Sequence, residues 1–321
     1  MTAALPDRRA RTVFIGTGPF GVAALRALAT RAPAGRIGLV GVVTTPGRPA
    51  GRRGEVLPSP IEAEAHALAI APIVALARLR PAESMAAVLA LRPDLIVLAD
   101  DGRIVPPALL AVPLGALNLH PSLLPRHRGA TPIPSTILAG DTETGVTIIR
   151  MDDGIDTGPI VAVERCPLTG TETAPMLEAQ LAIKAADLLM RTLAPWLDGQ
   201  LPATPQPDQG ATLTHMLRRE DGRLDPAGTV AQLERRVRAL QPWPGTYLDA
   251  DEGRLVVHAA ALAPLEPGDI PGHLVAHGSG LALVAADGRL VILEAQLPGG
   301  RRMAGADLRR GRPRLVGTPF R

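Results

Sequence analysis

Short apolar runs alternate with stretches of helical periodicity over residues 11–197. Residues 12–15 and 37–44 are apolar runs of strand length, whereas residues 20–32 and 61–69 carry apolar side chains at helical spacing. The same rhythm continues, and we expect four more strands and one long helix at residues 94–99, 116–120, 145–149, 160–164 and 173–193, respectively. This alternation predicts an α/β fold with a Rossmann-like, mostly parallel sheet.

The alternation ends at a proline-rich segment. Prolines at positions 202, 205 and 207 prevent a regular helix or strand there. We therefore expect a domain at residues 1–200, a linker at residues 201–208 and a second, smaller domain at residues 209–321.

The second domain has a different pattern. A helix fits residues 227–240, with Asp225 as its N-cap. Short alternating runs separated by turn residues follow at residues 254–262, 272–275, 281–284 and 290–295. They predict a small antiparallel β-barrel of OB-like form.

Composition narrows the class of protein. The 321 residues are 46% apolar and 20% charged, which excludes an intrinsically disordered chain, and 2% aromatic content argues against a protein that stacks single-stranded bases. The formal net charge is +3, and 33 of the 34 basic residues are arginines, the exception being Lys184. Positive charge gathers locally, because residues 301–321 hold seven arginines against Asp307 alone and could meet a phosphate backbone.

Cysteine usage and hydropathy suggest a compartment. Cys166 is the only cysteine, so the chain can form neither an intrachain disulfide nor a multi-cysteine zinc site, and we expect no metal. The first residues lack the apolar core of a signal peptide, and no run approaches 18 apolar residues. We expect a soluble, cytoplasmic protein with no membrane partner.

A glycine-rich turn offers one candidate cofactor site. Residues 16–21 read Gly-Thr-Gly-Pro-Phe-Gly, a GxGxxG pattern between an expected strand and an expected helix. A dinucleotide site also needs an acidic residue at the end of the next strand, where residues 41–45 read Gly-Val-Val-Thr-Thr. We interpret the glycines as a tight turn, and keep a nicotinamide oxidoreductase as an alternative.

The residues best suited to chemistry follow another strand. Asn118 and His120 lie on one face of residues 116–120, at the carboxyl end, where open α/β sheets bind ligands. Asp156 lies in a loop, residues 151–159, between two expected strands and can reach the same edge. An amide donor, an imidazole and a carboxylate together suit acyl or one-carbon transfer to an amine.

These residues also resemble a known family. Asn118-Leu-His120-Pro-Ser-Leu-Leu-Pro125, with Ile155-Asp156-Thr157-Gly158, is similar to the catalytic motifs of folate-dependent formyltransferases. The resemblance implies that Asn118, His120 and Asp156 are catalytic, that residues 1–200 are the catalytic domain, and that 10-formyltetrahydrofolate is the formyl donor. It implies that the folate is held by Leu98, Ala99, Asp100, Gly102, Ser122, Leu123, Leu124, Pro125, Asp152 and Asp153.

Other segments resemble the branch of that family that acts on methionyl-tRNA. Residues 46–52, 128–133 and 237–245 are similar to its tRNA-contacting loop, its RGAxPI segment and the start of its C-terminal domain. The resemblance implies initiator methionyl-tRNA as partner, held by a C-terminal tRNA-binding domain, and no DNA. We expect tRNA contacts from Arg48, Arg52, Arg53, Arg301 and Arg302, and a monomer.

The chain departs from the family pattern in places. Glu55 follows an arginine-glycine pair where lysines are common, Asp101 lies where an aromatic is common, His127 replaces an aromatic, and Pro134 interrupts the start of an expected helix. None of these is a catalytic position. Besides the nicotinamide oxidoreductase, two alternatives remain open: an enzyme that formylates amino sugars on nucleotides with the same donor, and a non-catalytic folate- or RNA-binding protein.

Overall fold

The computed structural model describes residues 8–32, 35–50, 54–250 and 253–320. Contacts divide the chain into two compact units. The N-terminal unit comprises Met1–Pro132, Glu143–Pro167 and Glu178–Thr214, and the C-terminal unit comprises Ile133–Thr142, Leu168–Leu177 and His215–Arg321. The boundaries expected from the prolines stay a prediction.

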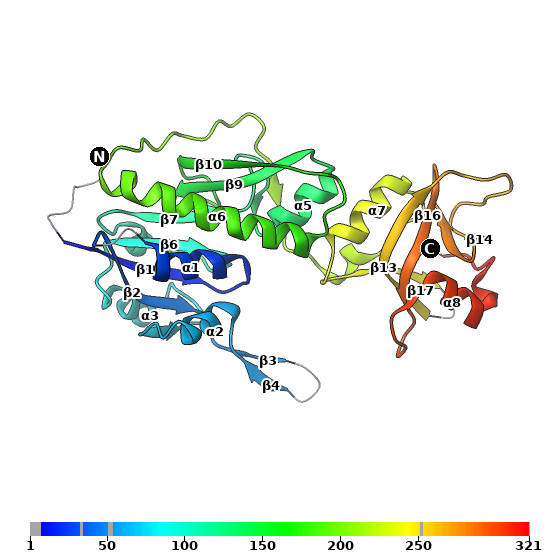
Figure 1. Ribbon diagram of the computed structural model, residues 1–321, viewed down its shortest axis with the longest axis horizontal. Helices are drawn as coiled ribbons and strands as arrows, with labels where there is room; N and C mark the ends of the chain where they lie inside the picture. Colours follow the sequence, from blue (N-terminus) through cyan, green and yellow to red (C-terminus); the bar gives the residue numbers. More distant parts are fainter. Residues whose placement is uncertain (1–7, 33–34, 51–53, 251–252, 321) are drawn as a thin grey trace. The chain divides into compact units, whose positions relative to one another are not determined.

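A seven-stranded sheet forms the centre of the N-terminal unit, in the order β10-β9-β7-β6-β1-β2-β5 (Figure 1). The five neighbouring strands β7, β6, β1, β2 and β5 are parallel to one another. At one end of the sheet, β9 is antiparallel to both of its neighbours, β7 and β10. The strands are β1 (Ala10–Gly16), β2 (Ile37–Thr44), β5 (Ile73–Ala75), β6 (Leu95–Ala99), β7 (Ala116–His120), β9 (Glu143–Arg150) and β10 (Ile160–Pro167). The predicted Rossmann-like, mostly parallel sheet is confirmed.

The helices and short elements that accompany this sheet were predicted less completely. The predicted long helix extends to Leu197, and the proposed interruption at Pro134 is wrong, because a helix includes that proline in its first turn, where no N–H bond is lost. The helices are α1 (Phe20–Arg31), α2 (Pro60–Ala67), α3 (Ala82–Leu89), α4 (Pro107–Leu110), α5 (Pro132–Ala139) and α6 (Ala174–Leu197). The sequence analysis named neither α3, α4 nor β5.

Strand alternation positions the polar residues of β7. Ala116 packs into an apolar cluster with Val13 of β1 and Ile96 of β6, on one face of the sheet. Asn118 and His120 lie on that same face, because alternate residues of a strand point the same way. The face that buries the core therefore becomes polar toward the carboxyl end of β7.

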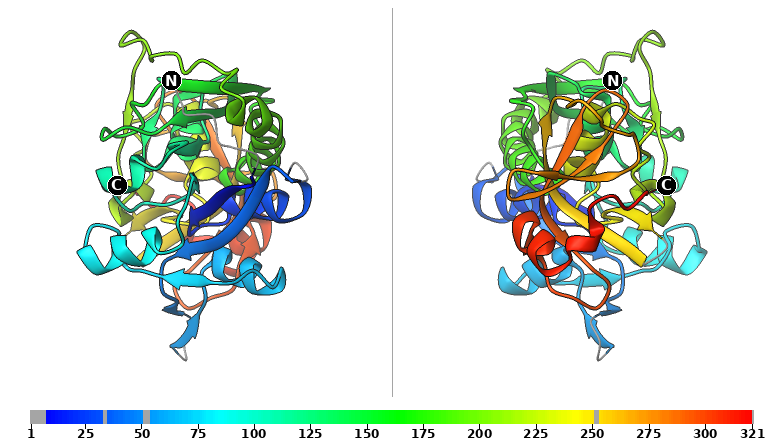
Figure 2. Two further views of the ribbon diagram at one scale, coloured as in Figure 1. Left: turned by 90° about the vertical axis from the view of Figure 1, so that its left-hand side faces the viewer. Right: turned by 90° about the vertical axis from the view of Figure 1, so that its right-hand side faces the viewer.

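Two short pairings connect loops of the N-terminal unit. A hairpin of β3 (Arg48–Ala50) and β4 (Glu55–Leu57) projects from this unit in Figures 1 and 2. Arg52 and Arg53, which come between β3 and β4 in the sequence, lie outside the described residues. Elsewhere, β8 (Arg128–Gly129) pairs in parallel with β11 (Leu213–Thr214).

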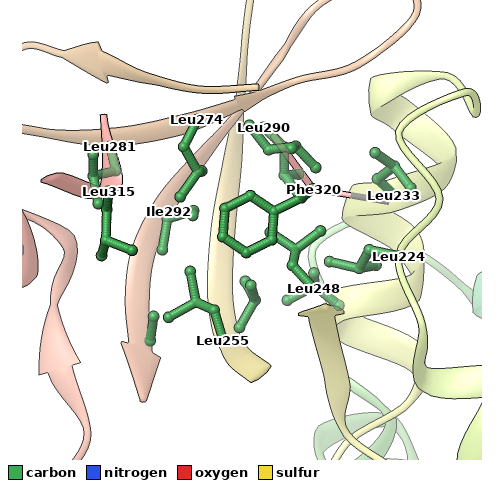
Figure 3. Close-up of a cluster of buried hydrophobic side chains, with 14 of the residues drawn as sticks. Leu224, Leu233, Leu248, Leu255, Leu274, Leu281, Leu290, Ile292, Leu315 and Phe320 are labelled. Atoms are coloured by element: carbon green, nitrogen blue, oxygen red, sulfur yellow. The ribbon is translucent and has the colours of Figure 1, made fainter. Parts of the chain in front are cut away.

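The C-terminal unit contains an antiparallel sheet in the order β12-β13-β16-β15-β14, with β17 paired to β16. Its elements are β12 (Thr246–Ala250), β13 (Gly253–Ala263), β14 (Leu274–His277), β15 (Gly280–Val284), β16 (Arg289–Gln296), β17 (Met303–Ala304), the helices α7 (Val230–Ala239) and α8 (Gly305–Gly311), and two 3-10 turns (Arg219–Gly222 and Pro313–Leu315). Leucines of the sheet and of α7 surround Phe320 in its core (Figure 3). The expected antiparallel β domain is confirmed, but no pairing among the described strands closes it into a barrel.

Helix α7 begins later than expected, at Val230. Thr229, and not Asp225, is the N-cap of α7, because its hydroxyl accepts from the N–H of Gln232 while the Gln232 side chain accepts from the N–H of Thr229. Asp225 accepts instead from the N–H of Ala227, in the preceding turn. The Thr-x-x-Gln pattern of a capping box was present in the sequence and was missed.

Candidate active site

The carboxyl end of β7 carries two buried polar side chains. Asn118 is 8% exposed and His120 is 4% exposed. Buried polar groups need hydrogen-bonding partners, so their surroundings define what each can do.

Asp156 supplies the partner for both side chains. Its Oδ1 accepts from Nδ2 of Asn118 at 3.2 Å, and its Oδ2 lies 3.5 Å from Nδ1 of His120. The same Oδ2 accepts from the backbone N–H of Gly129 at 2.8 Å. The structure thus brings together the three residues expected to be catalytic, from a strand and a loop 38 positions apart.

Left-handed backbone on both sides shapes this cluster. Asp156 has φ +51° and His127 has φ +58°, conformations that non-glycine residues rarely adopt. The turn at His127 directs its carbonyl oxygen to within 2.9 Å of Nε2 of His120. Both ring nitrogens of His120 therefore face oxygen acceptors, and only the doubly protonated ring donates to both.

Hydrogen bonds with Thr147 of β9 hold the loop after β7. The hydroxyl of Thr147 donates to the carbonyl of Ser122 at 2.7 Å and accepts from the N–H of Leu124 at 3.2 Å. The hydroxyl of Ser122, which is fully buried, donates to the carbonyl of Arg126. The Ser122 side chain therefore stabilises the loop, and a ligand would meet the backbone of this segment.

The other residues expected to hold folate lie in three segments, at positions 98–102, 123–125 and 152–153. Leu98 and Ala99 are buried in β6, and Leu98 is in register with Asn118. In the loop after β9, Asp152 accepts from the N–H of Gly154 and from the hydroxyl of Thr157. The remaining residues of the set are Asp100, Gly102, Leu123, Leu124, Pro125 and Asp153.

Asp100 fills the glycine-rich turn. The backbone N–H groups of Thr17 and Gly18 donate to its carbonyl oxygen, and the N–H of Phe20, at the start of α1, donates to its Oδ2 at 3.1 Å. A Cβ on Gly18 would lie 2.0 Å from that Oδ2. The carboxylate occupies the helix N-terminus where a dinucleotide phosphate would bind, which argues against the nicotinamide alternative.

Two carboxylates near this turn, those of Asp100 and Glu178, have raised pKa values. Loss of water around its carboxylate raises the pKa of Asp100, although part of the residue stays exposed. The hydrogen bond from the Phe20 N–H lowers this pKa, and the negative charge of Asp101 raises it. Burial, with a contribution from the charge of Asp100, raises the pKa of Glu178 in α6 to about 7. The turn is therefore a region of crowded negative charge.

Asp101 replaces the expected aromatic with an ion pair. Its carboxylate pairs with the guanidinium of Arg103, and the two side chains are 0% and 8% exposed. Arg103 also donates to the carbonyls of Thr44 at 2.9 Å and Leu76 at 2.7 Å, beyond the ends of two strands. This pair, which the sequence analysis missed, ties together the loops at the carboxyl edge of β2, β5 and β6.

The segment expected to be a linker contacts the site. The side-chain amide of Gln206 donates to the carbonyls of Asp156 and Gly158, each at 2.7 Å. The hydroxyl of Thr212 accepts from the N–H of His127 at 2.8 Å. Prolines concealed Gln206, because a proline-rich stretch is typical of linkers and no local pattern indicates what it contacts. Thr212 lies beyond the expected linker, among the residues expected to form the second domain.

The arginines expected to contact tRNA are distributed over both units. Arg48 begins β3, and Arg301 and Arg302 are exposed between β16 and β17. Among the described residues, no group of three or more His, Cys, Asp or Glu side chains could hold a metal ion. No helix in the described part of the chain is long and apolar enough to cross a membrane.

Comparisons with known proteins agree with this geometry. Residues 10–193 match the family model described as formyl transferase, and residues 216–313 match formyl transferase, C-terminal domain. The chain is 42% identical over 314 residues to the methionyl-tRNA formyltransferase of Halorhodospira halophila, covering 97% of this chain and 99% of that protein. It is 40% identical to that of Symbiobacterium thermophilum, covering 97% and 95%.

A solved structure shares the fold at low identity. The N-formyltransferase from Helicobacter canadensis, in complex with folinic acid and dTDP-3-aminofucose, superposes with a TM-score of 0.63 at 14% identity, covering 92% of this chain and 100% of that one.

Proposed function

Because the chain belongs to the formyl transferase family, we propose that it transfers the formyl group of 10-formyltetrahydrofolate to the α-amino group of initiator methionyl-tRNA, for translation initiation. The observation that carries this proposal is the convergence of Asn118, His120 and Asp156 at one strand end. It occurs in a chain that matches methionyl-tRNA formyltransferases over nearly its full length.

Asn118 and His120 stabilise negative charge as it develops on the formyl oxygen. One N–H of the Asn118 amide is bound to Asp156, and the second is left to donate to a substrate oxygen. Asp156 orients His120 and accepts, through water, the proton that the attacking amine loses. As the bond from the formyl carbon to the folate nitrogen breaks, that nitrogen takes up the proton and leaves as tetrahydrofolate. The folate donor supplies a formyl group already activated on nitrogen, so no nucleophilic side chain is needed.

The residues present fit the donor. Ile104 and Ile155, in the loops after β6 and β9, expose 62% and 68% of their surface. A flat pterin ring can cover such side chains, while Asp152 and Asp153 offer oxygen acceptors for its amino groups. We place the folate against these loops and the backbone of residues 122–125.

Arginines are the proposed contacts for the acceptor. Arg48 in β3, Arg52 and Arg53 after it in the sequence, and Arg301 and Arg302 in the C-terminal unit would meet tRNA phosphates. Arginine suits this task because its planar guanidinium forms paired hydrogen bonds to phosphate. We propose that the protein works as a monomer in the cytoplasm, which light scattering on the purified protein and fractionation would test.

The experiment uses both candidate acceptors. Purified protein is incubated with 10-formyltetrahydrofolate and either charged initiator tRNA or a nucleotide-linked amino sugar, and the products are detected by mass. We expect formyl-methionine from the first and no formylated sugar from the second. Formylated sugar as the sole product would instead establish the alternative, an enzyme that formylates amino sugars on nucleotides. Folate binding without any formyl discharge would favour a non-catalytic protein.

A further inference from the structure

The segment after α6 runs back along the N-terminal unit (Figure 1). Thr204 exchanges two backbone hydrogen bonds with Ile160 at the start of β10, at 2.7 and 2.8 Å. Farther along, β11 pairs with β8. Residues 204–214 are thus fixed at both ends, and we call them the strap.

Gln206 is the residue of the strap that contacts the catalytic loop. Its Nε2 donates to the carbonyls of Asp156 and Gly158, both at 2.7 Å. Its Oε1 accepts from Nε and Nη2 of Arg128 at 3.0 and 2.7 Å. The side-chain amide therefore uses both its donor and its acceptor, and joins the loop after β7 to the loop after β9.

These contacts bear on the position of one carboxylate. Asp156 adopts a left-handed backbone conformation, which an isolated loop would not retain. A Cβ on Gly158 would lie 2.0 Å from the carbonyl oxygen of Arg150, so the loop is closely packed where Gln206 binds it. On the other side, Gln206 holds the residue before Gly129, whose N–H donates to the Asp156 carboxylate.

We propose that Gln206 is a positioning residue that holds Asp156 in place for catalysis. It fixes the backbone of Asp156 on one side and, through Arg128, the amide that binds the Asp156 carboxylate on the other. The inference rests on the proposed function for its catalytic part only, because the positioning itself can be measured without substrate.

The test compares two glutamines that make the same kind of contact. Gln241, in the C-terminal unit, also donates through Nε2 to two backbone carbonyls, those of Val237 and His258, at 2.8 and 2.5 Å. Both glutamines are half-buried. Gln206→Met and Gln241→Met each remove two hydrogen bonds to backbone carbonyls while keeping nearly the same shape of side chain, and Gln206→Met also removes the two that Arg128 donates.

We expect Gln206→Met to lower kcat for formyl transfer by about 10- to 100-fold, because small displacements of a catalytic group have effects of this size. The KM for the folate donor should change less than about threefold, the Tm of both variants should stay above the assay temperature, and Gln241→Met should keep a near-normal kcat. Hydrogen exchange at the Gly129 amide should accelerate only in the Gln206 variant. Should Gln206→Met not fold, Gln206→Glu replaces it, since its carboxylate still pairs with Arg128 but cannot donate to the two carbonyls.

Two results would overturn the inference: a kcat within about twofold of that of Gln241→Met, or unchanged exchange at Gly129. If the wild-type protein formylates neither acceptor, the proposed function fails. The exchange measurement then still decides whether Gln206 holds Asp156.

Discussion

Two aspartates with nearly the same left-handed φ lie in the loops after β6 and β9, the strands on either side of β7 in the sheet of the N-terminal unit, and do different things. Asp156 has φ +51° and Asp100 has φ +54°. Each carboxylate accepts a backbone N–H, from Gly129 and Phe20, respectively. Asp156 also meets two side chains that can donate to a substrate, whereas Asp100 meets the turn before α1 and the negative charges of its neighbours.

The difference shows that a local motif is weaker evidence than the groups that converge on it. The GxGxxG turn has the sequence of a phosphate site, but the carboxylate of Asp100, directly after the neighbouring strand β6, fills it. The Asn-x-His segment has less regularity, yet the distant Asp156 completes it. Polar side chains that converge from separate segments indicate a site that can bind or transform a substrate. In the glycine-rich turn, by contrast, the backbone N–H groups are already bound within the protein.

The largest expected effect is at His120. Replacing it with alanine should lower kcat for formyl transfer by about 10²- to 10³-fold, because the variant loses one of the two groups that stabilise negative charge on the formyl oxygen. Single-turnover kinetics with charged initiator tRNA measures this. A variant with near-normal turnover would exclude the proposed mechanism, provided that its Tm matches that of the wild type.

A methyl group in the glycine turn should cost stability rather than chemistry. Gly18→Ala places a Cβ 2.0 Å from the Asp100 carboxylate, and overpacking of this kind destabilises by about 1–3 kcal/mol. Urea denaturation measures the loss. Because the clash is with one side chain, the double variant Gly18→Ala, Asp100→Gly should recover most of it; simple addition of the two single effects would show that the turn is not filled as described.

The pH dependence of stability should report on Glu178. Its pKa is about 7 in the folded protein against 4.5 ordinarily, so the folded state binds the proton more tightly than the unfolded state. This contribution to stability is fully present below pH 4.5 and is lost as the pH rises through 7. Because Glu178 is partly exposed, we expect the loss to be about 1–2 kcal/mol.

Glu178→Gln should remove that slope, which urea denaturation at pH 5 and pH 8 would show. Asp100→Asn should lessen it, because the charge of Asp100 contributes to the raised pKa of Glu178. An unchanged slope in Glu178→Gln would assign the pH dependence to other groups.

The smallest effect concerns tRNA binding. Arg48→Met should weaken affinity modestly and reduce the slope of log Kd against log salt by about 0.7 to 0.9, the value for one phosphate contact. Filter binding at several salt concentrations measures it, with His120→Ala as a control whose slope stays that of the wild type. A slope equal to that of the wild type in Arg48→Met would remove this arginine from the proposed contact surface.

Much of the fold follows from local pattern. Apolar runs at residues 37–44 and 116–120 match the bounds of β2 and β7, because strands buried on both faces leave a continuous apolar signal. Asn118 and His120 were identifiable since a strand places alternate residues on one face at its carboxyl end. Helix ends were harder, because both Asp225 and Thr229 can cap a helix and only the Gln232 partner decides between them.

The features that could not be predicted from the sequence depend on contacts between distant segments. Nothing near Asp100 in the sequence indicates that it fills the turn at Gly18, since this depends on how β6 lies beside β1. Gln206 lies among prolines, which indicate irregular backbone without indicating its neighbours. The Asp101–Arg103 pair was visible as opposite charges, but its burial against Thr44 was not.

The most direct test of the account compares the two aspartates themselves. Single-turnover transfer of formyl from saturating 10-formyltetrahydrofolate to methionyl-tRNA is measured for Asp156→Asn and Asp100→Asn. The account predicts that Asp156→Asn is slower by about 10²- to 10³-fold while Asp100→Asn stays within about threefold of the wild type. Equal losses in both variants, or a near-normal rate in Asp156→Asn, would contradict it.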